Sequence, residues 1–120
     1  MKRKPAISVI ICTYNGKRII DKCLNSILNQ KYPHFEVLCI DGGSKDGTIS
    51  IIRDYQKKDK RIKLLRNKNK FPEGIGNGKW KGFKRSKGNI IGMIDQDNVL
   101  QRTDIFSEII QIFKKNNKTD

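Results

Sequence analysis

Two carboxylates one residue apart follow an apolar stretch in the second half of the chain. Residues 89–94 are rich in isoleucine and predict a short buried strand, and Asp95 and Asp97 come directly after it. If the backbone stays extended there, residues i and i+2 point to the same side, and both carboxylates face one point. Two hard oxygen donors suit Mg²⁺ or Mn²⁺, which keep waters and bind substrate phosphate. The alternative for an isolated Asp-x-Asp is a polar turn without a ligand.

Three other apolar runs also end in polar residues or glycine. Runs at residues 7–12, 35–40 and 62–65 predict strands, the first two buried on both faces. The residues that follow are Thr13, Tyr14 and Asn15 after the first, Asp41 and Gly43 after the second, and Arg66 after the third. Four polar clusters after four strands are harder to dismiss than a single Asp-x-Asp.

Helical periodicity separates these strands. Apolar residues spaced by three and four predict helices over residues 17–30, up to about 57, over 79–87 and after about 104. Candidate N-caps are Ser44 or Asp46 for the second helix and Thr103 or Asp104 for the last. This alternation predicts an α/β fold: a parallel sheet of about four strands with helices on both faces. Ligands bind outside the carboxyl ends of such strands, where all four clusters are expected.

Length and charge limit what the chain can do. Its 120 residues suffice for one domain, spanning 1–120, with one core. The formal net charge of +14 favours nucleic acid, anionic lipid or phosphorylated small molecules, and a solvated lysine-rich surface is the alternative. There is no span-length apolar run, no cleavable leader and no paired cysteine spacing. We therefore expect a cytoplasmic protein, or one peripheral at the inner membrane face.

Three segments together resemble the family 2 glycosyltransferases of the GT-A fold. They are Ser8–Asn15, Asp41–Thr48 and Gly74–Asp97, in the family's order and with sensible spacing. The resemblance covers nearly the whole chain, but only the amino-terminal, nucleotide-sugar-binding half of the family's catalytic domain, which is Rossmann-like. It implies a nucleotide-diphospho-sugar donor, often a UDP-sugar, and an unknown acceptor that is a saccharide or lipid-linked.

The resemblance also implies roles for single residues. Thr13 and Tyr14 would line the nucleotide pocket, and Asp41 would contact the base. Asp97 would hold Mn²⁺ or Mg²⁺ on the diphosphate, while Asp95 would contact ribose or metal-bound water. The metal neutralises the charge that grows on the diphosphate as the sugar–phosphate bond breaks. The other residues expected at the nucleotide are Asn15, Gly43, Arg66 and Lys79.

The sequence departs from the family pattern in three places. Many relatives carry two consecutive aspartates where this chain has Asp41-Gly42. Their Ala-Arg-Asn is Gly78–Trp80 here, and its lysine lacks the bidentate geometry of arginine. The family's catalytic base, which takes the proton from the acceptor hydroxyl, lies in the half that this chain lacks, and no residue here is a candidate for it.

Three functions stay open at this point. The first is a glycosyltransferase donor domain that needs a partner chain or a second copy to complete it. The second is a non-catalytic module that binds nucleotide or nucleotide-sugar. A nucleic-acid binder is least favoured, because aromatic residues are not interleaved with the basic run at 57–70. A sheet that stops after four strands leaves an open edge, so we also expect self-association.

Overall fold

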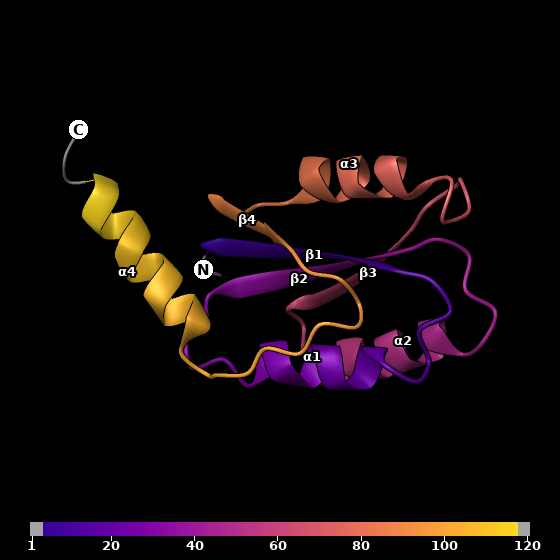
Figure 1. The fold of residues 1–120 in the computed structure, drawn as a ribbon, viewed down its shortest axis with the longest axis horizontal. Helices are drawn as coiled ribbons and strands as arrows, with labels where there is room; N and C mark the ends of the chain where they lie inside the picture. The colour runs from indigo at the N-terminus through magenta and orange to yellow at the C-terminus, as the bar shows by residue number, and fades with distance from the viewer. Residues whose placement is uncertain (1–3, 118–120) are drawn as a thin grey trace.

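A computed structural model describes residues 4–117 (Figure 1). The division into a single domain over 1–120 stays a prediction, and the ends of that range lie outside the described residues. The elements are β1 (Ile7–Thr13), α1 (Ile20–Leu28), β2 (Phe35–Asp41), α2 (Thr48–Lys58), β3 (Ile62–Arg66), α3 (Ile75–Arg85), β4 (Ile90–Met93) and α4 (Ile105–Asn117). The predicted order of strands and helices along the chain is therefore confirmed.

The four strands form one parallel sheet in the order β3-β2-β1-β4. β1 and β2 are central and almost wholly buried, as their apolar sequences predict. The prediction that the fourth strand is buried is wrong. Among the described strands β4 pairs with β1 alone, and its last residue, Met93, is 54% exposed. The self-association expected at this edge stays a prediction.

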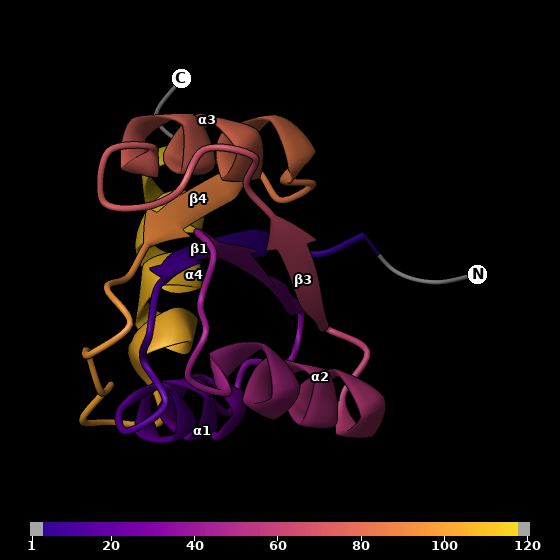
Figure 2. The ribbon, with the colours of Figure 1, turned by 90° about the vertical axis from the view of Figure 1, so that its right-hand side faces the viewer.

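Helices cover both faces of the sheet, as predicted (Figure 2). α1 and α2 lie on one face, and α3 lies on the other as an outer layer. Residues of β1 alternate between the two, so that Val9 and Ile11 join the larger core while Ile10 joins the smaller one under α3. α4 closes the larger core through Phe106, whose ring meets that of Phe35 edge to face at 5.2 Å.

Three helix starts differ from those that the sequence predicts, and the first is that of α1, which spans Ile20–Leu28 rather than residues 17–30. α3 begins at Ile75 rather than near residue 79, because Gly76 and Gly78 are helical, and Gly78 is turned toward the sheet. The N-cap of α2 is Gly47, with φ of 101°, and not Ser44 or Asp46. Asp46 still acts at this end, since its carboxylate accepts the N–H of Thr48 (3.1 Å).

Two further features of the fold are the state of the cysteine thiols and the length and apolar character of the helices. Cys12, Cys23 and Cys39 are free thiols, as their spacing predicts. Within residues 4–117, no helix combines the length and the apolar character needed to cross a bilayer.

Candidate functional site

The residues after the strands meet at the carboxyl edge of the sheet, which Figure 2 views from the front. Asp41 is the register partner of Thr13 on one side and of Arg66 on the other. Parallel strands in this register end side by side, so three of the four predicted clusters are neighbours by construction. The fourth, after β4, is joined to the first by hydrogen bonds described below.

Asp41 ties the end of β1 to the turn after β2. It is 1% exposed, and Oδ1 accepts hydrogen bonds from the hydroxyls of Thr13 (2.9 Å) and Ser44 (2.6 Å). Oδ2 accepts the N–H groups of Gly43 (3.0 Å) and Ser44 (2.8 Å). A carboxylate has about four acceptor positions, and all four are used within the protein. Asp41 therefore organises this edge, while its contact with a base stays a prediction.

Asn15 links the loops after β1 and β2. Its backbone is left-handed, with φ of 46°, a conformation that asparagine tolerates better than most residues. Its N–H donates to the hydroxyl of Ser44 (2.8 Å), and its Oδ1 accepts the N–H of Lys45 (2.9 Å). Together with the Thr13–Asp41 bond, these contacts make the two loops one connected unit.

Gln96, between the two aspartates, joins the loops after β4 and β1. Its Oε1 accepts the N–H of Tyr14 (3.1 Å), and its Nε2 donates to the carbonyl of Tyr14 (3.0 Å). This paired contact fixes the turn that carries Asp95 and Asp97 beside the end of β1. Gln96 was not among the predicted site residues, and the only signal for it in the sequence is its place inside the Asp-x-Asp.

The extended backbone expected through Asp97 is wrong. β4 ends at Met93, and residues 95–98 form a turn in which the N–H of Asn98 donates to the carbonyl of Asp95 (3.0 Å). The side chain of Asn98 accepts the N–H of Asp95 in return (2.9 Å). Such side-chain bonds compete with strand continuation. Both Asp95 and Asp97 are exposed on this turn.

Electrostatic effects on two thiols show what lies near each aspartate. Burial raises the pKa of the Cys12 thiol, Lys79 lowers it and Asp95 raises it. Lys79 from α3 and Asp95 from the turn after β4 thus act on the same group at the end of β1. Burial, with a smaller effect of Asp97, raises the pKa of Cys23 to about 11.

The carboxylates suit only one kind of metal site. No group of three or more histidine, cysteine, aspartate or glutamate side chains within residues 4–117 is arranged to hold an ion. A structural zinc site with four protein ligands is therefore not present in that range. Exposed carboxylates are the donor type that a hard cation such as Mg²⁺ or Mn²⁺ prefers, since it takes its other ligands from water and phosphate, and a metal at Asp95 and Asp97 stays a prediction.

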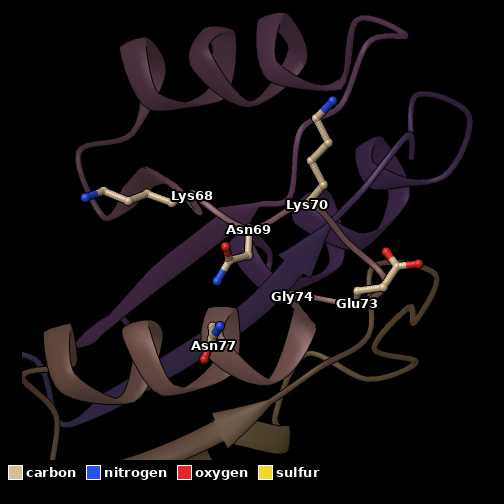
Figure 3. A pocket seen from close by; sticks show the side chains of 6 residues that line it. All are labelled: Lys68, Asn69, Lys70, Glu73, Gly74 and Asn77. Atoms are coloured by element: carbon tan, nitrogen blue, oxygen red, sulfur yellow. The ribbon is translucent and has the colours of Figure 1, made fainter.

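A pocket of about 430 Å³ lies between the β3–α3 loop and the start of α3 (Figure 3). It adjoins the turn after β2, because Cγ of Lys70 lies 3.3 Å from the Cβ position of Gly43. In Figure 3, Asn69 and Asn77 lie between loop and helix, while Lys68 and Lys70 extend away from them. This pocket was not predicted from the sequence, and its lining residues are Lys68, Asn69, Lys70, Glu73, Gly74 and Asn77.

Comparisons with known proteins agree with this fold. The model of the family described as glycosyl transferase family 2 matches residues 8–120. An uncharacterized glycosyltransferase of Haemophilus influenzae is 34% identical over 116 residues, which are 97% of this chain and 35% of that protein. The GalNAc(5)-diNAcBac-PP-undecaprenol beta-1,3-glucosyltransferase of Campylobacter jejuni is 33% identical over 96 residues, or 80% of this chain and 31% of that protein.

Solved structures show the same fold. S. aureus TarS 1-349 superposes with a TM-score of 0.83 at 26% identity, over 91% of this chain and 32% of that one, and its complex with UDP gives the same values. The mannosyltransferase PcManGT from Pyrobaculum calidifontis, in complex with GDP-Man and Mn²⁺, has a TM-score of 0.78 at 24% identity, a likeness of fold alone. This chain spans about a third of the length of such relatives. The chain belongs to glycosyl transferase family 2 and has the α/β fold of its GT-A members.

Proposed function

We propose that this chain is the donor-binding part of a glycosyltransferase and holds a nucleotide-diphospho-sugar, with a UDP-sugar as the first candidate. One observation carries the proposal: hydrogen bonds join the loops after three strands at one sheet edge, through Thr13–Asp41 and Tyr14–Gln96. Such an edge is where open α/β sheets bind ligands. A similar solved structure, TarS 1-349, is in complex with UDP.

Each predicted residue has a role in this proposal. Thr13 and Tyr14 form the wall of the nucleotide pocket, and Asp41 keeps that wall in place. Asp97 and Asp95 hold Mg²⁺ or Mn²⁺, which when bound neutralises charge on the diphosphate leaving group. The remaining roles are those of Lys79 and Arg66 as cations near the diphosphate and of Asn15 and Gly43 in shaping the turns around the nucleotide.

The transfer reaction as a whole is also part of the proposal. Because the chain spans about a third of its relatives, we place the acceptor site and the catalytic base in residues outside this chain. The acceptor is a saccharide or a lipid-linked saccharide, and the name of the Campylobacter jejuni relative includes PP-undecaprenol. Hydrolysis of UDP-glucose by the purified chain would show retained chemistry, whereas binding without turnover would favour a non-catalytic module.

Calorimetric titration of the chain with UDP tests the donor site. We expect Mn²⁺-dependent binding that a chelator abolishes and that Asp97→Asn weakens by about tenfold or more, the usual cost of a lost contact to a charged group. Asp54→Asn removes an exposed carboxylate from α2 and should leave the affinity unchanged. If UDP and GDP bind equally well with chelator and with Asp97→Asn, the donor-site proposal is wrong.

A further inference from the structure

α3 turns Gly78 and Gly82 toward the sheet and its two large aromatic residues away from it. A Cβ at Gly78 would lie 2.5 Å from Cζ of Phe71, and one at Gly82 would lie 2.7 Å from Cγ2 of Ile10, so both glycines allow close approach to the sheet side. On the opposite face Trp80 is 58% exposed and Phe83 is 47% exposed. Large aromatic side chains usually supply core area, so their exposure on an outer helix needs a reason.

The two aromatic rings form one apolar protrusion. Trp80 and Phe83 are stacked, with ring centroids 5.5 Å apart and planes 21° apart. Nζ of Lys84 lies over the Trp80 ring, 6.0 Å from its centroid. Helical spacing places Lys79 on the other flank of the pair. The protrusion is thus an apolar centre between two cations.

The surrounding segment carries charge of one sign only. Residues 74–94 contain no aspartate or glutamate. None of the ion pairs formed within residues 4–117 involves the cations of this segment. Those cations are Lys79, Lys81, Lys84, Arg85 and Lys87. Such a concentration of unpaired positive charge attracts an anionic partner.

We propose that the outer face of α3, defined as Trp80, Phe83 and Lys84, docks on an anionic lipid surface, with the exposed Arg85 at the end of the helix adding positive charge. Tryptophan and phenylalanine beside lysine and arginine are the composition of helices that lie in the membrane interface. The stacked rings enter the headgroup boundary, and the cations pair with lipid phosphates. This docking does not depend on the donor site, which lies at the carboxyl ends of the strands.

Two other partners fit the face less well. A nucleic acid needs ring faces open for base stacking, but the Trp80 ring is stacked on Phe83 and has Lys84 over it. A second copy would bring two identical cationic faces together, which repel each other. Charge complementarity therefore favours lipid, and both alternatives are outcomes of the test.

Trp80 is the only tryptophan in the chain, so its fluorescence reports on this face directly. Vesicles of phosphatidylcholine with phosphatidylglycerol, at about 0.15 M ionic strength, should shift the Trp80 emission to the blue. They should also protect Trp80 from quenching by iodide. Vesicles of phosphatidylcholine alone should leave it unchanged. In a sedimentation assay, Trp80→Ser with Phe83→Ser should no longer pellet with the anionic vesicles. Circular dichroism confirms that these variants, changed at exposed positions, are folded.

Charge reversal supplies the matched comparison. Lys84→Glu with Arg85→Glu should lower partitioning by about 30-fold or more, from about fivefold for each cation near an anionic surface. Lys114→Glu with Lys115→Glu makes the same charge change at the end of α4, beside Phe113, which is 42% exposed. This control should retain wild-type partitioning. UDP binding should be unchanged in both variants, which separates docking from the donor site.

Four results would overturn the proposal. The first is no partitioning into anionic vesicles, and the second is an equal loss in the α4 control. The third is a Trp80 emission shift without lipid that grows with protein concentration, because it identifies a second copy as the partner. The fourth is a shift with a single-stranded oligonucleotide and none with vesicles, because it identifies nucleic acid.

Discussion

The ring of Phe71 occupies the space where a side chain at position 42 would stand. A Cβ at Gly42 would overlap the ring at Cγ, closer than real side chains approach one another. The N–H of Phe71 also donates to the carbonyl of Gly42 (3.0 Å), which holds the β3–α3 loop against the turn after β2. This gives a local reason for the departure from the paired aspartates of many relatives: here the second position must be glycine.

Replacement of Gly42 should therefore be costly only while Phe71 is present. We expect Gly42→Asp to lower the free energy of unfolding by about 1–3 kcal/mol or more, because the buried ring must move. Combined with Phe71→Ala, it should cost less than the sum of the single changes, with a coupling of about 0.5–3 kcal/mol. Urea unfolding of the four proteins measures this, and strict additivity would contradict it.

Gly76→Ala, with nothing within 4 Å of the new Cβ, should stabilise α3 by about 0.5–1 kcal/mol.

Asp41→Asn tests whether the carboxylate organises the edge. An amide keeps one acceptor oxygen and faces two of the four donors with its own N–H groups, so we expect a loss of about 2–4 kcal/mol in unfolding free energy. UDP and GDP should both bind more weakly, and the ratio of their two affinities should be the same as in the wild type. Thr13→Val removes one of the four bonds and should cost about 1 kcal/mol. A change in the UDP-to-GDP ratio with unchanged stability would instead show direct contact with the base.

Much of the fold could be predicted because its signals are local. Apolar runs of strand length and helical periodicity identify the elements, and alternation along the chain implies the parallel sheet. The start of α3 was missed because glycine weakens an isolated helix, whereas in the structure Gly78 and Gly82 allow close packing on Phe71 and Ile10. β4 resembles the central strands in residue type, but its exposure depends on its place at the sheet edge, which only the spatial order determines.

For the site, the sequence predicted which loops meet but not how they are joined. Strand ends are local features, and the sheet brings them together without further information. The Gln96–Tyr14 contact joins residues 82 positions apart, and no periodicity encodes such a bond. The turn at 95–98 likewise depends on the side chain of Asn98, whose Oδ1 accepts the N–H of Asp95.

Gln96 offers a test of how far the turn must be fixed for metal-dependent binding. Gln96→Ala removes both bonds to the Tyr14 peptide group, and we expect Mn²⁺-dependent UDP affinity to fall by about tenfold, the equivalent of one to two ordinary hydrogen bonds. Gln96→Glu keeps the acceptor and loses the donor, so its affinity for UDP should lie between those of the wild type and Gln96→Ala. Gln101→Ala, which removes only a local bond to Val99, is the matched control. Equal UDP affinity in the wild type and Gln96→Ala would show that the contact is not needed.

Glu36 should control the acid stability of the opposite edge. Burial alone would raise its pKa, but bonds from the Ser8 hydroxyl (2.6 Å), the Lys87 N–H (2.7 Å) and the Lys63 ammonium (3.2 Å) outweigh it and hold the pKa below its usual value. A folded-state pKa below the unfolded one contributes stability that is complete above the unfolded value and is lost as pH falls through the folded value.

Glu36→Gln should therefore lower the unfolding free energy at neutral pH by about 1–3 kcal/mol and flatten its fall between about pH 5 and pH 3. Urea unfolding across this range measures both effects. Glu73→Gln removes an exposed carboxylate from the β3–α3 loop and serves as the comparison, with the neutral-pH stability of the wild type expected. An acid slope in Glu36→Gln as steep as in the wild type would mean that other carboxylates cause the acid unfolding, because the substituted protein no longer has this group to protonate.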